Sequence, residues 1–241
     1  MAEKTLEQMR EAVEEIRAKM AAAAREAGRD PAQVQLCAAC KTRTAETVAA
    51  SAALPIDVFG ENHVQELCAN FDAGAYCGKP SHFIGHLQTN KIKKVLGRAS
   101  LIQSVDSEHL LNAIEKEAAR AGIVQDVLLE VNVAGELSKG GCTPDEAWEL
   151  AQLAQSLEHV RLRGLMAIPP IAQKPGDNTP YFSMMKKLYV DIKEKIAHNQ
   201  DDMDCLSMGM SGDYEDAIAQ GATLVRVGTA LFGPRPPMAK Q

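Results

Sequence analysis

Short apolar runs and helical stretches alternate eight times along this chain, and that alternation limits the folds open to it. Strands are predicted at 34–40, 57–60, 82–85, 101–105, 127–133, 162–168, 205–208 and 223–227. The helices or helical turns that follow them are predicted at 45–53, 64–71, 90–96, 108–121, 144–157, 181–198 and 214–220, and the eighth strand leads into Phe232. Strands separated by helices pair in parallel through right-handed crossovers. The sequence therefore predicts an α/β protein with a single (β/α)8 TIM-type barrel, and an open doubly wound sheet is the structural alternative.

An extra N-terminal helix is expected before the first strand. Over residues 3–28, apolar side chains recur at steps of three and four. Thr5 is placed to cap this helix, with Gln8 in the capping-box position, and Gly28 is placed to end it. Residues 1–241 are then one barrel domain, and the Pro-rich tail at 234–241 is expected to be disordered.

Composition and charge argue against several classes of protein. Hydrophobic residues make up 46% of the chain and aromatic residues only 4%, so the core must be built from aliphatic side chains, which suit a barrel interior. The net charge of −6 argues against a nucleic-acid partner, because such proteins usually carry a basic face. We find neither a secretory signal nor an apolar run long enough to span a membrane, so a cytoplasmic location is expected.

The six cysteines do not have the spacing of a metal site. Cys37 and Cys40 form a CxxC pair, but they lie in a predicted strand, where side chains three apart point to opposite faces. No second pair follows at a metal-like spacing. Buried free thiols are therefore favoured over a metal or redox site.

Lys41 directly follows the first predicted strand, at the end where a barrel places its active site. Strand alternation puts Lys41 on the same side as Cys37 and Ala39. A lysine that faces inward is partly desolvated, which frees its amine to attack an aldehyde. Taken alone, a lysine at a strand end is more often a surface residue.

The segment Ser207–Asp213 follows the seventh predicted strand and resembles an anion-binding loop. Two glycines and two hydroxyl side chains precede a helix there. Ser211 is a candidate N-cap for that helix, Gly212 lets a ligand approach the backbone, and Met210 lies beside them. Free amides at a helix start favour an anion.

A second candidate anion site lies at the eighth strand. Alternation puts Arg226 on the face that carries Leu224 and Gly228. An arginine inside a barrel needs a partner, and a ligand atom would serve. Gly228 and Thr229 offer backbone amides and a hydroxyl just beyond the strand. The loops after strands seven and eight are where barrels often bind phosphate, so the two candidate sites are expected to meet.

Together, these residues describe a site for pyridoxal 5′-phosphate. Lys41 would bond to the aldehyde of this cofactor, the two loops would hold its phosphate, and Arg226 would lie beside its ring. Because an arginine keeps its charge, it would leave the ring nitrogen unprotonated. This weakens the ring as an electron sink and disfavours chemistry that needs a fully developed carbanion.

The chain resembles the pyridoxal phosphate homeostasis protein family, also called the proline synthase co-transcribed family. The segments that carry the resemblance are Lys41-Thr42, Phe59-Gly60-Glu61-Asn62, His82–Gln88, Ser104–Ser107, Gly164-Leu165-Met166, Leu206–Asp213 and Val225–Gly233. The resemblance implies a barrel like the N-terminal domain of alanine racemase, without the second domain of that enzyme. It further implies a protein that binds, buffers or delivers the cofactor in intracellular vitamin B6 homeostasis, without catalytic turnover.

The resemblance also assigns roles to individual residues. It implies that Lys41 forms the aldimine and that Ser211, Gly228 and Thr229 hold the phosphate. Arg226 would lie by the ring nitrogen. The pocket would also be lined by Asn62, and by Met210 beside Ser211.

Some positions depart from the usual pattern of the family. Cys40 stands where a serine often precedes the lysine, and His63 stands where a tyrosine often follows Glu-Asn. The pair Gly141-Cys142 also differs, but no departure removes a proposed cofactor contact. His82 and His86 lie four apart on a strand and its loop, so hydrogen bonding or pocket lining is favoured for them over metal binding.

Two other functions stay open beside that of a cofactor carrier. A weak amino-acid racemase would use the same aldimine but needs a second acid–base group opposite the lysine, and of the four tyrosines only Tyr214 is placed for it. We favour a structural role for Tyr214. The other function is a protein-interaction module that senses the cofactor. The expected partners are the cofactor and apo-enzymes that receive it, and a monomer is expected because the dimerising domain of racemases is not found.

Overall fold

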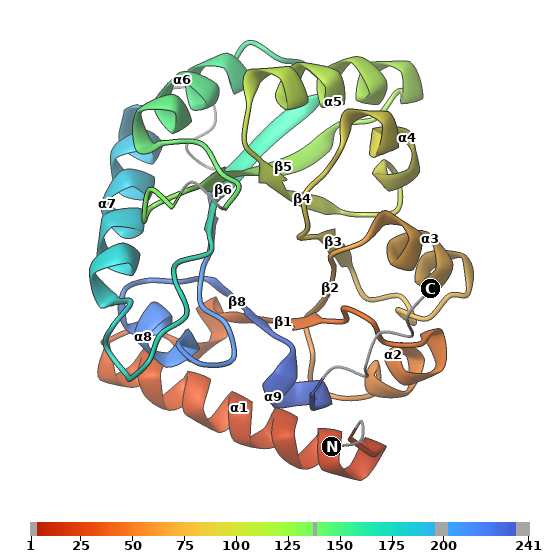
Figure 1. Cartoon of the computed structure of the whole chain (residues 1–241), viewed down its shortest axis with the longest axis vertical. Coiled ribbons are helices and arrows are strands. Elements are labelled where there is room, and N and C mark those ends of the chain that lie inside the picture. The colour runs from red at the N-terminus through yellow and green to blue at the C-terminus, as the bar shows by residue number, and fades with distance from the viewer. Residues whose placement is uncertain (1–3, 137–138, 196–201, 235–241) are drawn as a thin grey trace.

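The computed structural model describes residues 4–136, 139–195 and 202–234. Within these residues, eight parallel strands close into a barrel in the order β1 to β8, and helices surround it (Figure 1). The strands are β1 Gln35–Ala39, β2 Val58–Glu61, β3 Ser81–Phe83, β4 Leu101–Val105, β5 Gln125–Val131, β6 Val160–Ala167, β7 Cys205–Ser207 and β8 Leu224–Val227. The helices are α1 Leu6–Glu26, α2 Ala45–Ser51, α3 Val64–Asp72, α4 Ile92–Val95, α5 Glu108–Ala121, α6 Pro144–Ala154, α7 Thr179–Lys195, α8 Tyr214–Ala219 and α9 Thr229–Phe232, with short 3-10 turns at Pro31–Gln33 and Thr89–Lys91. The predicted (β/α)8 TIM-type barrel is confirmed, and the open sheet is excluded because β8 pairs with β1.

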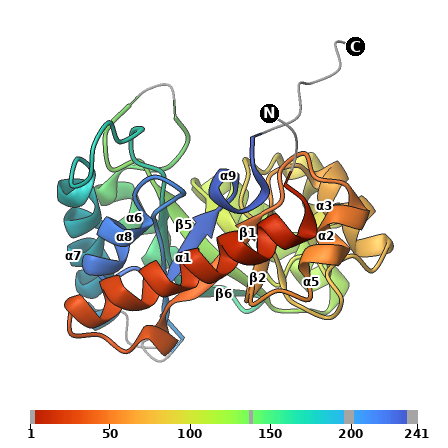
Figure 2. The same ribbon diagram turned by 90° about the horizontal axis from the view of Figure 1, so that it is seen from below.

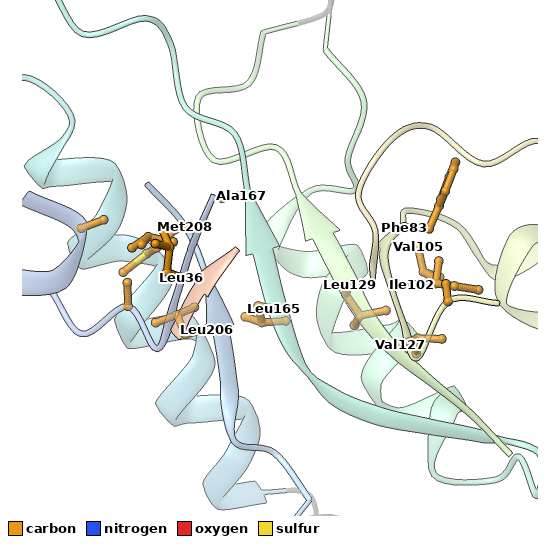
Figure 3. Packing of buried hydrophobic residues seen from close by; sticks show 14 of the residues in the cluster. Leu36, Phe83, Ile102, Val105, Val127, Leu129, Leu165, Ala167, Leu206 and Met208 are labelled. Atoms are coloured by element: carbon orange, nitrogen blue, oxygen red, sulfur yellow. The ribbon is translucent and has the colours of Figure 1, made fainter. Parts of the chain in front are cut away.

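Side chains alternate between the barrel interior and the layer beneath the helices. Cys37 packs inside the barrel with Leu128 and Leu224. Ala38 and Cys40 belong instead to the main core outside the strands. Figure 3 shows this main core, with Leu36, Phe83, Ile102, Val105, Val127, Leu129, Leu165, Ala167, Leu206 and Met208 labelled. The alternation predicted for the first strand is therefore confirmed, because Cys37 and Cys40 face opposite ways.

Helix α1 is the predicted extra helix, and it completes the outer layer beside β8 and β1. Figure 2 shows it lying across the outside of the barrel. The Thr5 hydroxyl accepts from the Gln8 amide and the Gln8 side chain accepts from the Thr5 amide, so the predicted capping box is confirmed. Lys4 donates from its backbone to Phe232 (3.1 Å) and from Nζ to Ala230 (2.7 Å). These bonds join the segment just before α1 to α9. The helices α8 and α9, which follow β7 and β8, have only 6 and 4 residues.

The predicted boundaries agree in full for β4 and α5 and differ elsewhere by a few residues. Strands β5 and β6 both begin two residues earlier than predicted. Arg161 (2.7 Å) and Arg163 (2.6 Å) of β6 pair with Asp126 on the neighbouring β5, and these ion pairs join the early parts of both strands. The first residue of the predicted helix 3–28, the last three residues of the predicted helix 181–198 and most of the predicted tail, at 235–241, lie outside the described residues.

The cysteines are free thiols, and four of the six are buried. Burial raises the pKa of Cys37 and of Cys205 to about 12, which keeps both thiols protonated and unreactive. Cys77 is exposed, so the expectation of buried thiols does not hold for it. The described part of the chain holds no cluster of three His, Cys, Asp or Glu residues that could bind a metal, and no described helix could cross a membrane.

Candidate functional site

A cavity of about 270 Å³ opens at the carboxyl-terminal mouth of the barrel. All the predicted cofactor-binding residues line it: Lys41, Asn62, Met210, Ser211, Arg226, Gly228 and Thr229. The other lining residues are Ala39, Arg43, Ile84, Ile168 and Gly212. These residues follow or end β1, β2, β3, β6, β7 and β8, so only closure of the barrel brings them together. The volume lies just below the usual range for small-ligand pockets, about 300–1,000 Å³.

Lys41 lies just past β1 in a turn that is held in an unusual conformation. The next residue, Thr42, has a φ of 64°, which is rare for a β-branched residue. The Thr42 amide donates to Glu66 Oε1 (3.3 Å), and its hydroxyl donates to the Lys41 carbonyl (2.6 Å). Among the described residues, none forms a hydrogen bond or ion pair with Lys41 Nζ. The turn therefore presents a free amine to the cavity.

The loop after β7 forms a polar cradle, but not in the way that the sequence predicted. Ser211 is not the N-cap of α8, because that helix begins at Tyr214 and its N-cap is Asp213. The Ser211 hydroxyl instead accepts from the amide of Ala230 in α9 (3.3 Å). Within the described part of the chain, the backbone amides of Ser211 and Gly212 donate to no protein acceptor. An anion in the cavity would find these two amides free.

Asn62 reaches the cavity because the ends of β2 and β3 approach each other closely. A Cβ atom at Gly85 would lie 2.0 Å from the Asn62 carbonyl oxygen. The Ile84 amide also donates to the carbonyl of Glu61 (2.8 Å). Only a glycine at position 85 allows this approach, so Gly85 fixes where Asn62 lies.

Arg226 points into the barrel and is buried, as the alternation predicted. Its Nη1 donates to Ser207 Oγ (2.5 Å) and its Nη2 donates to the Ala167 carbonyl (2.8 Å). Burial lowers the pKa of Arg226, while the Cys37 thiol and the Glu130 carboxylate oppose this shift. Both of its hydrogen-bond partners are neutral dipoles, so the guanidinium can still attract an acceptor atom of a ligand.

Two residues at or beneath the cavity were not identified from the sequence, Arg43 and Gln103. Arg43 lines the cavity, donates to the Gly233 carbonyl (2.7 Å) and lies over the Phe232 ring. Gln103 is buried inside the barrel and bonds to His82 Nδ1 (2.8 Å). Gln103 could have been identified from the sequence, because it is a polar residue at an inward position of the predicted strand 101–105.

His82 and Tyr214 have the structural places that were favoured for them, but His86 neither lines the cavity nor forms a hydrogen bond with a described residue. His82 is buried and hydrogen-bonded, whereas His86 is exposed. Tyr214 is buried in the main core and does not line the cavity. The described part of the cavity wall therefore contains no tyrosine.

Comparisons with known proteins agree with this geometry. Residues 11–236 match the family described as "Alanine racemase, N-terminal domain". The pyridoxal phosphate homeostasis protein of Aquifex aeolicus is 42% identical over 87% of this chain and 90% of its own length. That of Pseudomonas aeruginosa is 38% identical over 93% of this chain and 95% of its own length.

Solved structures show the same relationship. A protein of unknown function from Bifidobacterium adolescentis matches with a TM-score of 0.88 and 38% identity, over 94% of this chain and 95% of that chain. PipY of Synechococcus elongatus, solved with PLP bound, matches with a TM-score of 0.75 and 31% identity, over 90% and 100%. The alanine racemase of Clostridium difficile shares the fold at 14% identity, with a TM-score of 0.70 over 95% of this chain and 58% of that enzyme.

Proposed function

Since this chain belongs to the alanine racemase N-terminal domain family and, within it, to the pyridoxal phosphate homeostasis proteins, we propose that it carries pyridoxal 5′-phosphate as a Schiff base on Lys41. The Nζ atom of Lys41 adds to the cofactor aldehyde, a C=N bond forms and water leaves. This reaction is reversible and needs no oxidant or reductant. A reversible bond suits a protein that stores and releases the cofactor in vitamin B6 homeostasis.

One observation supports this proposal above the others: a lysine amine and two backbone amides, none with a partner among the described residues, line the same small cavity as a buried arginine. The amides of Ser211 and Gly212, with Thr229, can hold a phosphate, because backbone N–H groups bind phosphate oxygens well. The Arg226 guanidinium can donate to the ring nitrogen. Each polar feature of the cofactor then has a partner in this chain.

The same residues favour binding over turnover. An arginine at the ring nitrogen leaves that atom unprotonated, so the bound ring is a weak electron sink. A two-base racemase also needs an acid–base group opposite Lys41, and Tyr214 is buried away from the cavity. We therefore propose a carrier without catalytic turnover, with a weak amino-acid racemase as the alternative.

The decisive experiment is reduction of the loaded protein with borohydride, followed by peptide mass analysis. We expect the reduced adduct on Lys41, and no adduct in Lys41→Ala. Lys116→Ala is the matched control, because Lys116 is an exposed lysine on α5, away from the cavity. An adduct that persists in Lys41→Ala would contradict the proposal.

The absence of turnover needs a test of its own. We expect no exchange of the α-hydrogen of alanine for deuterium in the loaded protein. Sustained exchange that vanishes in Lys41→Ala would favour the racemase.

We further propose that this protein works as a monomer and passes the cofactor to apo-enzymes. Gly212 and Thr229 are exposed, so the phosphate end of the cavity is open to solvent and the cofactor can leave. Sedimentation of the loaded protein would measure its oligomeric state. Activation of an apo-enzyme by the loaded protein, in the presence of a scavenger of free cofactor, would detect direct transfer.

A further inference from the structure

A column of hydrogen-bonded side chains crosses the barrel interior from Arg226 to the opposite mouth. Arg226 Nη1 donates to Ser207 Oγ (2.5 Å), and Ser207 Oγ donates to Gln103 Oε1 (2.6 Å). Gln103 Nε2 bonds to His82 Nδ1 (2.8 Å). His82 also lines a second cavity, at the amino-terminal ends of the strands, beside Asp126 and Arg163. Residues from β8, β7, β4 and β3 thus form one connected path.

The direction of each hydrogen bond in this column follows from its first member. A guanidinium can only donate, so the Ser207 oxygen must accept from Arg226 and its hydrogen must point to Gln103. The Gln103 oxygen then accepts, so its amide group donates to His82 Nδ1. The His82 hydrogen is left on Nε2, and burial supports this neutral form because it lowers the pKa of His82 to about 4. One consistent arrangement therefore connects four side chains.

The burial of the column makes this arrangement rigid. Ser207 and Gln103 are 0% exposed, Arg226 is 5% exposed and His82 is 7% exposed. Ser207 and Gln103 line neither of the two cavities, so a broken bond between them leaves a buried polar atom unsatisfied. The guanidinium of Arg226 is therefore held in one orientation before any ligand arrives.

We propose that Ser207, Gln103 and His82 are positioning residues, which fix the guanidinium of Arg226 so that it points at the ring of the bound cofactor. The inference rests on the proposed function for the identity of the ligand, but the column itself is a property of this chain. None of the three residues lines the cofactor cavity, so they act only through Arg226.

The first test uses the protein without cofactor. Nitrogen-15 NMR measures how fast the Arg226 guanidinium rotates about its Cζ–Nε bond. We expect slow rotation in the natural protein and rotation at least about tenfold faster in Ser207→Ala and Gln103→Leu, since each change removes a buried bond. Ser207→Ala removes a single hydroxyl, so it tests the column even if Gln103→Leu does not fold.

Ser104→Ala is the matched control for these variants. Ser104 is as buried as Ser207 and lies next to Gln103 on β4, but its hydroxyl has no partner among the described residues. We expect the rotation in Ser104→Ala to equal that of the natural protein. Equal rotation in Ser207→Ala and Ser104→Ala would overturn the proposal.

The second test uses cofactor labelled with nitrogen-15 in its ring. In Ser207→Ala we expect a shifted ring-nitrogen resonance and an approximately tenfold weaker affinity, while Ser104→Ala keeps both values. If the natural protein takes up no cofactor on Lys41, the proposed function is refuted. The rotation measurement would still show whether the column holds the Arg226 guanidinium. The natural protein could instead load normally while Ser207→Ala shows the same ring-nitrogen resonance and the same affinity. That result would refute the positioning role of the column and leave the proposed function standing.

Discussion

Asn178 donates its side-chain amide to Asp213 Oδ2 over 2.7 Å, and this bond joins the loop after β6 to the loop after β7. Asp213 Oδ1 accepts from the Met210 amide (2.7 Å), so the same carboxylate shapes the segment that lines the cavity. Asn178 also donates to the Pro170 carbonyl (2.9 Å). Both Asn178 and Asp213 are buried. The irregular segment before α7 thus supports the loop after β7 that lines the cavity.

Asn178→Ala should therefore weaken both the fold and the binding of the cofactor. The Asp213 carboxylate would lose a buried donor, which costs about 1–3 kcal/mol of unfolding free energy. Urea unfolding measures that loss, and equilibrium dialysis measures the affinity for pyridoxal phosphate. Asn112→Ala, which removes an exposed amide on α5, should change neither by more than about 0.5 kcal/mol. Equal stability of the two variants would contradict this account.

Alanine substitutions at two glycines should separate folding from binding. In Gly85→Ala, the new Cβ would meet the Asn62 carbonyl at 2.0 Å, so the backbone must move and the unfolding free energy should fall by about 1–3 kcal/mol. In Gly212→Ala, the Cβ would meet no atom within 4 Å, so stability should change by less than about 0.5 kcal/mol. Both variants should bind the cofactor more weakly. Gly85→Ala would displace Asn62, and the methyl group of Gly212→Ala would stand beside a free amide of the cradle. Calorimetry measures the stability of each variant, and dialysis measures its affinity for the cofactor. Only Gly85→Ala should lose stability, whereas both should lose affinity.

Glu130 should make the stability of the protein depend on pH. Burial raises its pKa to about 7, although Arg226 opposes the shift. Because the pKa of Glu130 is higher in the folded chain than in the unfolded chain, the folded chain binds this proton more tightly. The stability that results is complete below the pKa of an ordinary glutamate and is lost as the pH rises through about 7. Glu130→Gln should therefore gain stability relative to the natural protein between pH 5 and pH 8, on the order of 2 kcal/mol. Urea unfolding at both pH values measures this gain, and a difference that does not change with pH would refute it.

His82 should give the opposite dependence at lower pH. Burial lowers its pKa to about 4, so between about pH 6.5 and pH 4 the unfolded chain binds a proton that the folded chain does not. The stability that this residue contributes is complete above pH 6.5 and is lost as the pH falls through that window. His82→Gln removes the titration, so its stability relative to the natural protein should rise as the pH falls from 7 to 4.5. Thermal unfolding across that range would check the slope, with His86→Gln, at an exposed histidine, as the control.

The barrel and the residues that face its mouth could be predicted from the amino-acid sequence alone. The period of two in strands and of about 3.6 in helices is a local property, so the eight units and the inward direction of Arg226 could be predicted from neighbouring residues. The position of Lys41 at the end of β1 followed from the same local pattern. Resemblance to a family added Asn62, which no local pattern had singled out.

The hydrogen bonds that hold these residues in place could be read only from the folded barrel. The partner of Ser211 is the amide of Ala230, 19 residues away, and that bond replaced the helix cap that was predicted from nearby residues. Ser207 and Gln103 are 104 residues apart, and Asn178 and Asp213 are 35 apart. The first and third of these pairs meet because neighbouring strands pair side by side, and Ser207 meets Gln103 because β7 and β4 face each other across the closed barrel. Local periodicity carries no information about which distant side chains the closed barrel brings within bonding distance.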